Sequence, residues 1–211
     1  IQMEFPKSGY RTMQCYLKLA GMVVGERYSR RVMKEYGLQA KIKKRFVATT
    51  DSNHDCLVHP NHLPSMRVTG LNQVWVADIT YIRILNNFVY LAVILDVYSR
   101  KVIGYAISKN IDRHLTLKAL QMAVKERRPP KGVFHHSDRG VQYLCDDYVE
   151  VLRANHFHIS CSAKGNPYDN AFAESFMKTL KSNEVDLKHY ETLLDVMEDV
   201  PYFLEEVYNK K

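Results

Sequence analysis

The sequence predicts an α/β protein in which a mixed five-stranded sheet is flanked by helices and preceded by a small all-α segment. Two observations support this fold class. The chain has 211 residues, of which 46% are hydrophobic and 25% charged, which suits one good-sized domain with a small appendage. After residue 71, β-rich and helical stretches follow in the order βββαβαβα, which places antiparallel strands first and alternating strands and helices later.

The composition argues against membrane and secreted proteins. The longest apolar run, Phe88 to Leu95, has eight residues, whereas about 20 are needed to span a bilayer, and no charged-then-apolar signal segment opens the chain. The four cysteines are too few and too scattered for a disulfide framework. We therefore expect reduced thiols and a cytoplasmic location. Because the first residue is Ile1, we also expect that the native start is missing.

The excess positive charge is confined to the first third of the chain. Residues 1–70 carry 12 Lys and Arg against 5 Asp and Glu, whereas residues 71–211 carry 18 of each kind, so the net charge of +7 belongs to the first segment. A basic appendage on a neutral body indicates a polyanion partner that the appendage binds. The alternative is a basic surface that serves solubility alone.

Residues 9–40 show a helical pattern that is interrupted at Gly21. We expect Ser29 to cap the second helix and Gly37 to end it. Two short basic helices around a turn are typical of a helix-turn-helix, so we expect residues 1–45 to form a DNA-binding segment, with a structural helical hairpin as the alternative. The basic residues expected to contact DNA are Arg30, Arg31, Lys43, Lys44 and Arg45.

Residues 46–70 show little periodicity and are rich in Asn, His, Pro and Ser, which predicts a linker. The folded body is expected over residues 71–211. Its strands are expected at 74–84, 88–97, 101–108, 133–136 and 157–161, and its helices at 113–125, at 143–154 and from about residue 170. The first three strands are joined by connections short enough for hairpins, so we expect them to be antiparallel.

Three acidic residues stand where a soluble sheet would not normally place them. Asp78 interrupts an apolar strand, Asp138 follows the end of a predicted strand, and Glu174 lies among apolar residues in the first turns of a helix. Buried carboxylates need a cation or a partner, and Mg²⁺ and Mn²⁺ prefer carboxylate oxygens. Because a pair of such ions supports phosphoryl transfer, the three residues predict a metal-dependent site of that kind. Taken singly, each carboxylate is better explained by a structural role, such as a cap or a surface pair.

The acidic residues lie within three longer motifs, Trp75 to Tyr81, His136 to Tyr143 and Gly165 to Phe176. These motifs, in this order, resemble those of the integrase-core transposases of bacterial insertion sequences, which are relatives of retroviral integrases. Between Asp138 and Glu174 lie 35 residues, the spacing that names the DD(35)E group. The resemblance covers about residues 72–209 and, more weakly, the helical segment before them.

The resemblance implies a ribonuclease H-like fold, which has the same βββαβαβα order, with Asp78, Asp138 and Glu174 as the catalytic and metal-binding residues. It implies that water cleaves DNA at the element's ends and that the freed 3′-hydroxyl attacks target DNA, both steps with Mg²⁺ or Mn²⁺. Asp78 and Asp138 would share the ions, and Glu174 would complete the shell of the second. Lys178 and Lys181 would face the terminal DNA, with ordinary solvated lysines as the alternative. The resemblance also implies a homo-oligomer on DNA, associated with the bacterial nucleoid.

Four further residues in or beside these motifs have structural interpretations. We expect Trp75 and Tyr81 to pack in the core and the sheet rather than to stack on bases. His135 and His136 end a strand beside Asp138, and we expect them to be hydrogen-bonded structural histidines, with a catalytic or ligand role as the alternative.

Two features depart from the family pattern. Tyr208 and Asn209 are followed by two lysines at the chain end, where the family usually continues, and Pro201 falls inside the expected last helix, which it would kink or break. We therefore expect both ends to be clipped and an upstream recognition region to be absent. The alternatives to an active transposase are a truncated, non-catalytic DNA-binding inhibitor of transposition and a ribonuclease H-like nuclease without strand transfer.

Overall fold

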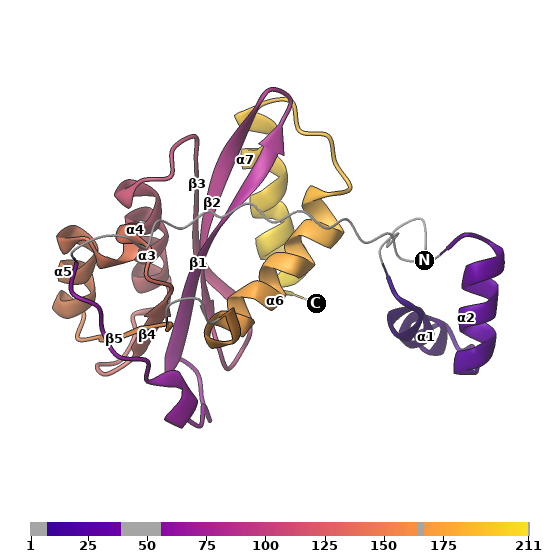
Figure 1. Cartoon of the computed structure of the whole chain (residues 1–211), viewed down its shortest axis with the longest axis horizontal. Helices are drawn as coiled ribbons and strands as arrows, with labels where there is room; N and C mark the ends of the chain where they lie inside the picture. Colours follow the sequence, from indigo (N-terminus) through magenta and orange to yellow (C-terminus); the bar gives the residue numbers. More distant parts are fainter. Residues whose placement is uncertain (1–7, 39–55, 164–166, 211) are drawn as a thin grey trace. The chain divides into compact units, whose positions relative to one another are not determined.

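The structure, a computed structural model, describes residues 8–38, 56–163 and 167–210 (Figure 1). The chain separates into two compact units, residues 1–47 and 48–211. In its described part the smaller unit is all-α, and the larger unit contains the sheet.

The smaller unit contains two ten-residue helices, α1 (Tyr10–Leu19) and α2 (Glu26–Glu35). Over residues 8–38 the buried apolar side chains are Met13 of α1 and Met33 of α2, and the two helices contact each other. The sequence predicts two short basic helices joined by a turn, and the structure contains them.

The start of α2 differs from the expected one. The helix begins at Glu26 after Gly25, and Ser29 lies one turn inside it, where its hydroxyl donates a hydrogen bond to the carbonyl oxygen of Gly25 (3.1 Å). The N-cap is Gly25 rather than Ser29. Inside the helix, the buried hydroxyl of Ser29 is satisfied by the carbonyl oxygen four residues before it. Gly37 follows the helix with a φ of +65°, a left-handed conformation that glycine adopts without strain and that ends the helix as expected.

The larger unit is built on a five-stranded mixed sheet with the strand order β3-β2-β1-β4-β5. Strands β1 and β2 pair in antiparallel fashion, as do β2 and β3, whereas β1–β4 and β4–β5 are parallel. The prediction of a mixed sheet with antiparallel strands first is thereby confirmed. The strands are β1 (Val74–Ile84), β2 (Asn87–Asp96), β3 (Val102–Ser108), β4 (Phe134–Ser137) and β5 (His158–Cys161).

Helices cover both faces of this sheet (Figure 1). One layer consists of α3 (Arg113–Arg127), α4 (Val141–Leu144) and α5 (Asp146–Ala154), and the other of α6 (Ala171–Leu180) and α7 (Leu193–Tyr202). Because successive strand residues point to opposite faces, β1 serves both layers. Val74 and Val76 belong to the core under α6 and α7, whereas Trp75 and Ala77 belong to the core under α3 to α5.

Helix α3 packs closely on β3 because Gly104 has no side chain. A Cβ atom at this position would lie 2.3 Å from the carbonyl oxygen of Ala119 and 2.7 Å from the Cβ of Ala123, closer than any real contact. The glycine therefore sets the spacing between the sheet and the layer of α3 to α5.

The helix predicted over 143–154 is two helices in the structure. At Cys145 the backbone is extended (φ −68°, ψ 150°), so α4 ends there and α5 begins at the next residue. A new helix is favoured at this point because Asp146 and Asp147 stand in the first turn of α5, where negative side chains interact favourably with the helix dipole.

Both C-terminal helices widen into π-helical turns. Helix α6 continues as η3 (Lys181–Val185), and α7 continues as η4 (Phe203–Tyr208). Pro201 lies inside α7, and the chain does not break there. It instead changes to the wider π geometry two residues later, which accommodates a residue that cannot donate a backbone hydrogen bond.

The described part of the expected linker, residues 56–70, packs on the larger unit. Its short 3₁₀ turn, η1 (Leu63–Ser65), precedes Met66 and Val68, which with Leu63 pack against the apolar core. The backbone N–H of His62 also donates a hydrogen bond to Ser160 Oγ (3.0 Å) beside β5. Isolated apolar residues without periodicity gave no signal of this packing in the sequence.

Candidate active site

Asp78 lies in the middle of β1, at the point where its parallel neighbour β4 ends. The register pairs Val76 with His136, and β4 stops one residue later, so Asp78 stands at the open edge of β1. Its side chain is partly buried, and its Oδ1 accepts a hydrogen bond from the backbone N–H of Ile79 (2.9 Å). The strand thus holds this carboxylate at a fixed position on the sheet.

Asp138 follows the last residue of β4. Because Val76 pairs with His136 in parallel register, Asp78 and Asp138 are two residues further along neighbouring strands and lie side by side. The Oδ1 of Asp138 accepts a hydrogen bond from the backbone N–H of Gly140 (2.9 Å), which closes the turn that leads into α4.

Glu174 reaches the site from the other direction. It is an exposed residue near the start of α6, a helix that packs against β1. Its charge acts on Asp78, although less strongly than that of Asp138. The structure therefore brings the two strand-borne carboxylates together and places Glu174 near them.

The electrostatics of Asp78 are those of a crowded anionic site. Burial, and then the neighbouring charges of Asp138 and Glu174, raise the pKa of Asp78 to about 7, against the opposing effects of the Ile79 N–H and Lys181. Such crowding is unfavourable unless a cation relieves it.

The donor set fits a hard divalent cation, because its ligands are carboxylate oxygens only. Within the described residues, however, no group of three His, Cys, Asp or Glu side chains is already gathered closely enough to hold a metal ion. Asp78 lies on β1 where the neighbouring strand β4 ends, Asp138 directly follows β4, and Glu174 lies on α6, exposed.

Lys181, at the start of η3, lies close to Tyr81 of β1 and its charge acts on Asp78. Its Nζ is 4.4 Å from the ring centroid of Tyr81, and burial lowers its pKa although Asp186 and Asp78 act in the opposite direction. Tyr81 also packs edge-on against Phe88 (5.4 Å between centroids), as expected for a sheet residue. The sequence prediction missed the contact of Tyr81 with Lys181, because these residues are 100 positions apart.

Lys178 is exposed one turn beyond Glu174 on α6. Trp75 is fully buried, and its Nε1 donates a hydrogen bond to Asn72 Oδ1 (3.2 Å), which confirms its core role.

His135 and His136 are buried residues of β4, shortly before Asp138 in the chain. His136 is hydrogen-bonded through both ring nitrogens, to Ser160 Oγ (2.9 Å) and Ser162 Oγ (3.1 Å), and the Nε2 of His135 bonds to the hydroxyl of Tyr148 (2.9 Å). Burial lowers the pKa of His135 to about 3 and that of His136 to about 4, so both rings are neutral near pH 7.

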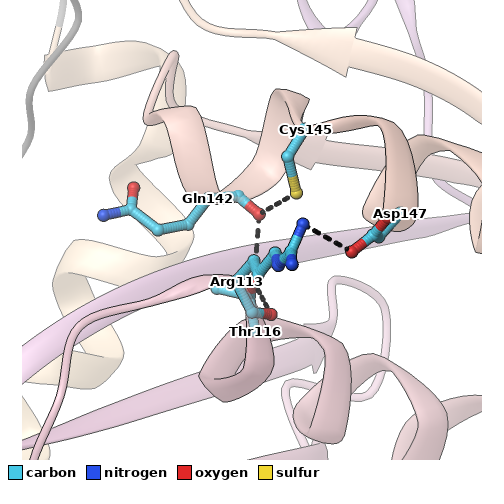
Figure 2. A network of polar contacts seen from close by, with 5 residues as sticks. All are labelled: Arg113, Thr116, Gln142, Cys145 and Asp147. Atoms are coloured by element: carbon cyan, nitrogen blue, oxygen red, sulfur yellow. Dashed lines mark hydrogen bonds and ion pairs between the residues drawn. The ribbon is translucent and has the colours of Figure 1, made fainter.

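A polar network holds α4, the helix after the Asp138 turn, against α3 (Figure 2). The Thr116 hydroxyl lies 3.0 Å from the carbonyl oxygen of Gln142, and the Sγ of Cys145 donates a hydrogen bond to the same oxygen (3.5 Å). Arg113 forms an ion pair with Asp147 of α5 (3.0 Å). The backbone around Asp138 is therefore fixed from behind by the α3 to α5 layer.

Aromatic contacts hold α6 from its opposite side. The guanidinium of Arg100, in the turn between β2 and β3, lies 4.2 Å from the ring centroid of Phe172, and Tyr208 packs edge-on against Phe176 (4.9 Å). The position of Glu174 thus depends on how this helix docks on the sheet.

In the smaller unit, the basic residues predicted to contact DNA are exposed but engaged with neighbours. The guanidinium of Arg30 lies 4.1 Å from the ring centroid of Tyr10, hydrogen-bonds its hydroxyl and pairs with Glu26 (2.8 Å). Arg31 is 3.9 Å from Glu35. The remaining predicted residues, Lys43, Lys44 and Arg45, lie outside the described residues.

The strand order, with one carboxylate on β1, one at the end of β4 and one on a helix packed against β1, defines a ribonuclease H-like catalytic domain. A family model described as an integrase core domain matches residues 69–167. A 31 kDa protein of insertion element IS600 from Shigella sonnei is 40% identical over 96% of this chain and 75% of its own length. The IS904 transposase of Lactococcus lactis is 33% identical over 90% and 76%, respectively. The chain belongs to the integrase-core transposases of bacterial insertion sequences, and so to the DDE transposase and integrase enzymes.

Other similarities agree with this assignment. The IS3A transposase InsF of Escherichia coli is 39% identical over 75% of this chain, which spans 55% of the length of InsF. Among solved structures, a chain of the simian T-cell lymphotropic virus intasome matches 92% of this chain and 65% of its own, with a TM-score of 0.56 and 16% identity. The catalytic domain of Mos1 mariner transposase matches 64% and 71%, with a TM-score of 0.51 and 12% identity. These structural similarities show the shared ribonuclease H-like fold.

Within the described residues, no helix combines the length and the apolar character needed to cross a bilayer.

Proposed function

We propose that this transposase cleaves DNA at transposon ends and joins the freed 3′-hydroxyl to target DNA, with Asp78, Asp138 and Glu174 as its catalytic and metal-binding residues. The observation that carries the proposal is the parallel register of β1 and β4, which sets Asp78 beside Asp138 at the end of β4. The raised pKa of Asp78, to about 7, supports it, because this value reflects burial beside two further carboxylates.

The reaction consists of two phosphoryl transfers. In the first, the oxygen of water bonds to phosphorus while the bond to the 3′-oxygen breaks, and a proton from the water ends on that oxygen to give a 3′-hydroxyl. In the second, this 3′-oxygen bonds to a target phosphorus, the bond to the target's own 3′-oxygen breaks, and a proton passes from the attacking oxygen to the leaving one. Neither step requires a covalent bond to the protein.

The residues contribute position and charge. Asp78, Asp138 and Glu174 would hold Mg²⁺ or Mn²⁺, which when bound supplies activation of the attacking oxygen and stabilisation of the leaving one. Asp78 and Asp138 are preformed by strand register, and Glu174 closes the site from α6. Lys178 and Lys181 bind the DNA backbone beside the carboxylates, as their placement one and two turns beyond Glu174 favours.

The partners follow from this assignment. Residues 1–45 form the DNA-binding segment, in which Arg30, Arg31, Lys43, Lys44 and Arg45 contact DNA, residues 46–70 connect it to the core, and residues 71–211 form the catalytic core. The protein acts as a homo-oligomer on terminal repeats and target DNA, in the bacterial cytoplasm at the nucleoid. The net charge of +7, which lies in the first 70 residues, supports DNA binding by that segment.

Nicking of a supercoiled plasmid in Mn²⁺ tests the proposed carboxylates. We expect the purified chain to nick the plasmid, chelation to stop the reaction, and Glu174→Gln to abolish it. Glu150→Gln, which changes an exposed glutamate of α5, is the matched control and should retain full activity. Nicking that persists in Glu174→Gln would refute the assignment, and DNA binding without any cleavage would favour the truncated inhibitor.

Joining distinguishes a transposase from a nuclease. Labelled duplexes that copy the DNA flanking this gene and end in a 3′-hydroxyl should become covalently joined to the plasmid. Nicking without joining would identify a ribonuclease H-like nuclease instead.

A further inference from the structure

Tyr143 carries a buried hydroxyl without a partner. The residue is 3% exposed, and its hydroxyl has no hydrogen-bond partner among the described residues. Its ring packs edge-on against Tyr148 (5.5 Å between centroids) in the apolar core that also contains Ala77. A buried hydroxyl that makes no hydrogen bond is unfavourable, so such a group calls for an explanation.

The chain geometry places Tyr143 beside the candidate active site. The backbone N–H of Tyr143 donates to the carbonyl oxygen of Gly140 (2.9 Å), and the N–H of Gly140 donates to Asp138 Oδ1 (2.9 Å), so Tyr143 stands on the turn that carries Asp138. Ala77, a member of the same apolar core, directly precedes Asp78 in the sequence. At Asp78, β1 has run past the end of β4, so the edge of β1 that β4 covers further back is open there.

The electrostatics support a donor role for the hydroxyl. Burial, and then the charges of Asp78, Tyr148 and Asp138, raise the pKa of Tyr143 well above its ordinary value. The phenol therefore keeps its proton at every working pH. Asp78 and Asp138 are the carboxylates among the groups whose charges act on it, and the charge of Asp78 has the larger effect of the two. Each of these carboxylates accepts a backbone hydrogen bond through its Oδ1 and has a second oxygen.

We propose that Tyr143 is a positioning residue, whose hydroxyl donates a hydrogen bond to the Asp78 carboxylate and orients it when the site takes up a divalent cation. The inference rests on the proposed function, since it needs Asp78 to be a metal ligand. Outer hydrogen bonds of this kind orient metal-binding carboxylates, and their loss commonly weakens metal affinity about 10- to 100-fold. In the loaded site the hydroxyl of Tyr143 would have the carboxylate of Asp78 as its hydrogen-bond partner.

Binding of Mn²⁺ alone to the full chain, followed by the electron paramagnetic resonance signal of the free ion, tests the proposal without any turnover. We expect Tyr143→Phe to weaken Mn²⁺ binding about 10-fold or more. The melting temperature of the metal-free variant should be unchanged or higher, because the atom removed makes no hydrogen bond there.

Tyr148→Phe is the matched control, as it removes a buried hydroxyl that is bonded to His135. It should lower the melting temperature by about 2–4 °C and leave Mn²⁺ affinity unchanged. Wild-type Mn²⁺ affinity in Tyr143→Phe would overturn the inference, whether or not the melting temperature changes.

A third variant separates this inference from the proposed function. If Asp78→Asn loses Mn²⁺ binding while Tyr143→Phe keeps it, the carboxylate site stands and only the role of Tyr143 is refuted. If Asp78→Asn binds Mn²⁺ as tightly as the wild type, the proposed metal site falls, and the role of Tyr143 falls with it.

Discussion

Asp78 stands on β1 and Asp138 directly follows the neighbouring strand β4, whereas Glu174 stands on a helix that packs over the sheet. The strand-borne pair is partly buried, tied to backbone N–H groups and set side by side by the β1–β4 register. Glu174 is exposed, and its position depends on side-chain contacts between α6 and its surroundings. Backbone pairing between strands therefore positions Asp78 and Asp138, whereas the packing of α6 on the sheet positions Glu174.

The largest expected effect is the loss of activity when either kind of carboxylate is neutralised. Asp78→Asn and Glu174→Gln should each reduce Mn²⁺-dependent nicking on the order of 1000-fold. Their effects on stability should differ, because Asp78→Asn removes a charge crowded by two others, whereas Glu174 is exposed. Thermal melts of the metal-free variants at pH 7.5 should show a raised melting temperature for Asp78→Asn alone. Equal shifts in both variants would contradict the distinction.

The next largest effect is a pH dependence that comes from Asp78. Its pKa in the folded chain, about 7, lies above its ordinary value of 3.8, so the folded state holds an extra proton between these values. Stability from this group is therefore full below about pH 4 and is lost as the pH rises through 7, by at most about 4 kcal/mol. Urea unfolding of the metal-free chain at pH 5 and pH 8 measures it.

Asp78→Asn is the reference for that pH measurement. Subtracting its unfolding free energies from those of the wild type removes the contributions of all other groups. The difference should favour the wild type more at pH 5 than at pH 8. A difference that is the same at both pH values would show that Asp78 titrates normally.

The packing behind the strand-borne pair is tested at Gly104. Gly104→Ala places a methyl group against the backbone of α3 and should destabilise the larger unit by about 1–3 kcal/mol. Gly70→Ala is the control, since a Cβ there meets only the side chain of Gln73, at 3.5 Å. Denaturant unfolding of both variants makes the comparison, and an equal cost at the two glycines would contradict the close approach of α3 to β3.

The smallest expected effects concern two sets of contacts that hold the site in place: the polar network between α3 and α4, and the contacts of Phe172 and Phe176 on α6. Thr116→Val removes the hydroxyl that faces Gln142 of α4, and Arg100→Gln removes the cation over Phe172 of α6, each at about 1 kcal/mol. Amide hydrogen exchange should accelerate in α4 for the first variant and in α6 for the second. If one variant accelerated exchange in both helices, the contacts that hold α4 and those that hold α6 would not be independent.

The strands of the larger unit were predictable because they are long and patterned. Strand β1 spans 74–84, as predicted, and the ends of β2, β3 and β5 lie within one residue of the predicted ends. Apolar runs bounded by turn residues determine such elements locally. The break at Cys145 and the packing of residues 56–70 were missed, because they depend on helix-end electrostatics and on scattered apolar side chains that meet a distant surface.

The candidate site divides in the same way. Asp78, Asp138 and Glu174 were predictable as acidic residues in unusual places, and their catalytic role stays a prediction. The contact of Lys181 with Tyr81 and the unpartnered hydroxyl of Tyr143 were not predictable, because burial and cross-chain proximity arise only after the layers pack. A tyrosine in a motif has no sequence signal that tells whether its hydroxyl is satisfied.

The side-chain amide of Asn209 behaves as a substitute strand residue at the outer edge of β3. Its Oδ1 accepts a hydrogen bond from the N–H of Val102 (2.9 Å), and its Nδ2 donates one to the carbonyl oxygen of the same residue (2.8 Å). An incoming strand from a second molecule would need both of these backbone groups for pairing. Asn209 therefore blocks sheet extension at this end of β3, so a second strand could not pair with these backbone groups unless the Asn209 side chain moved away.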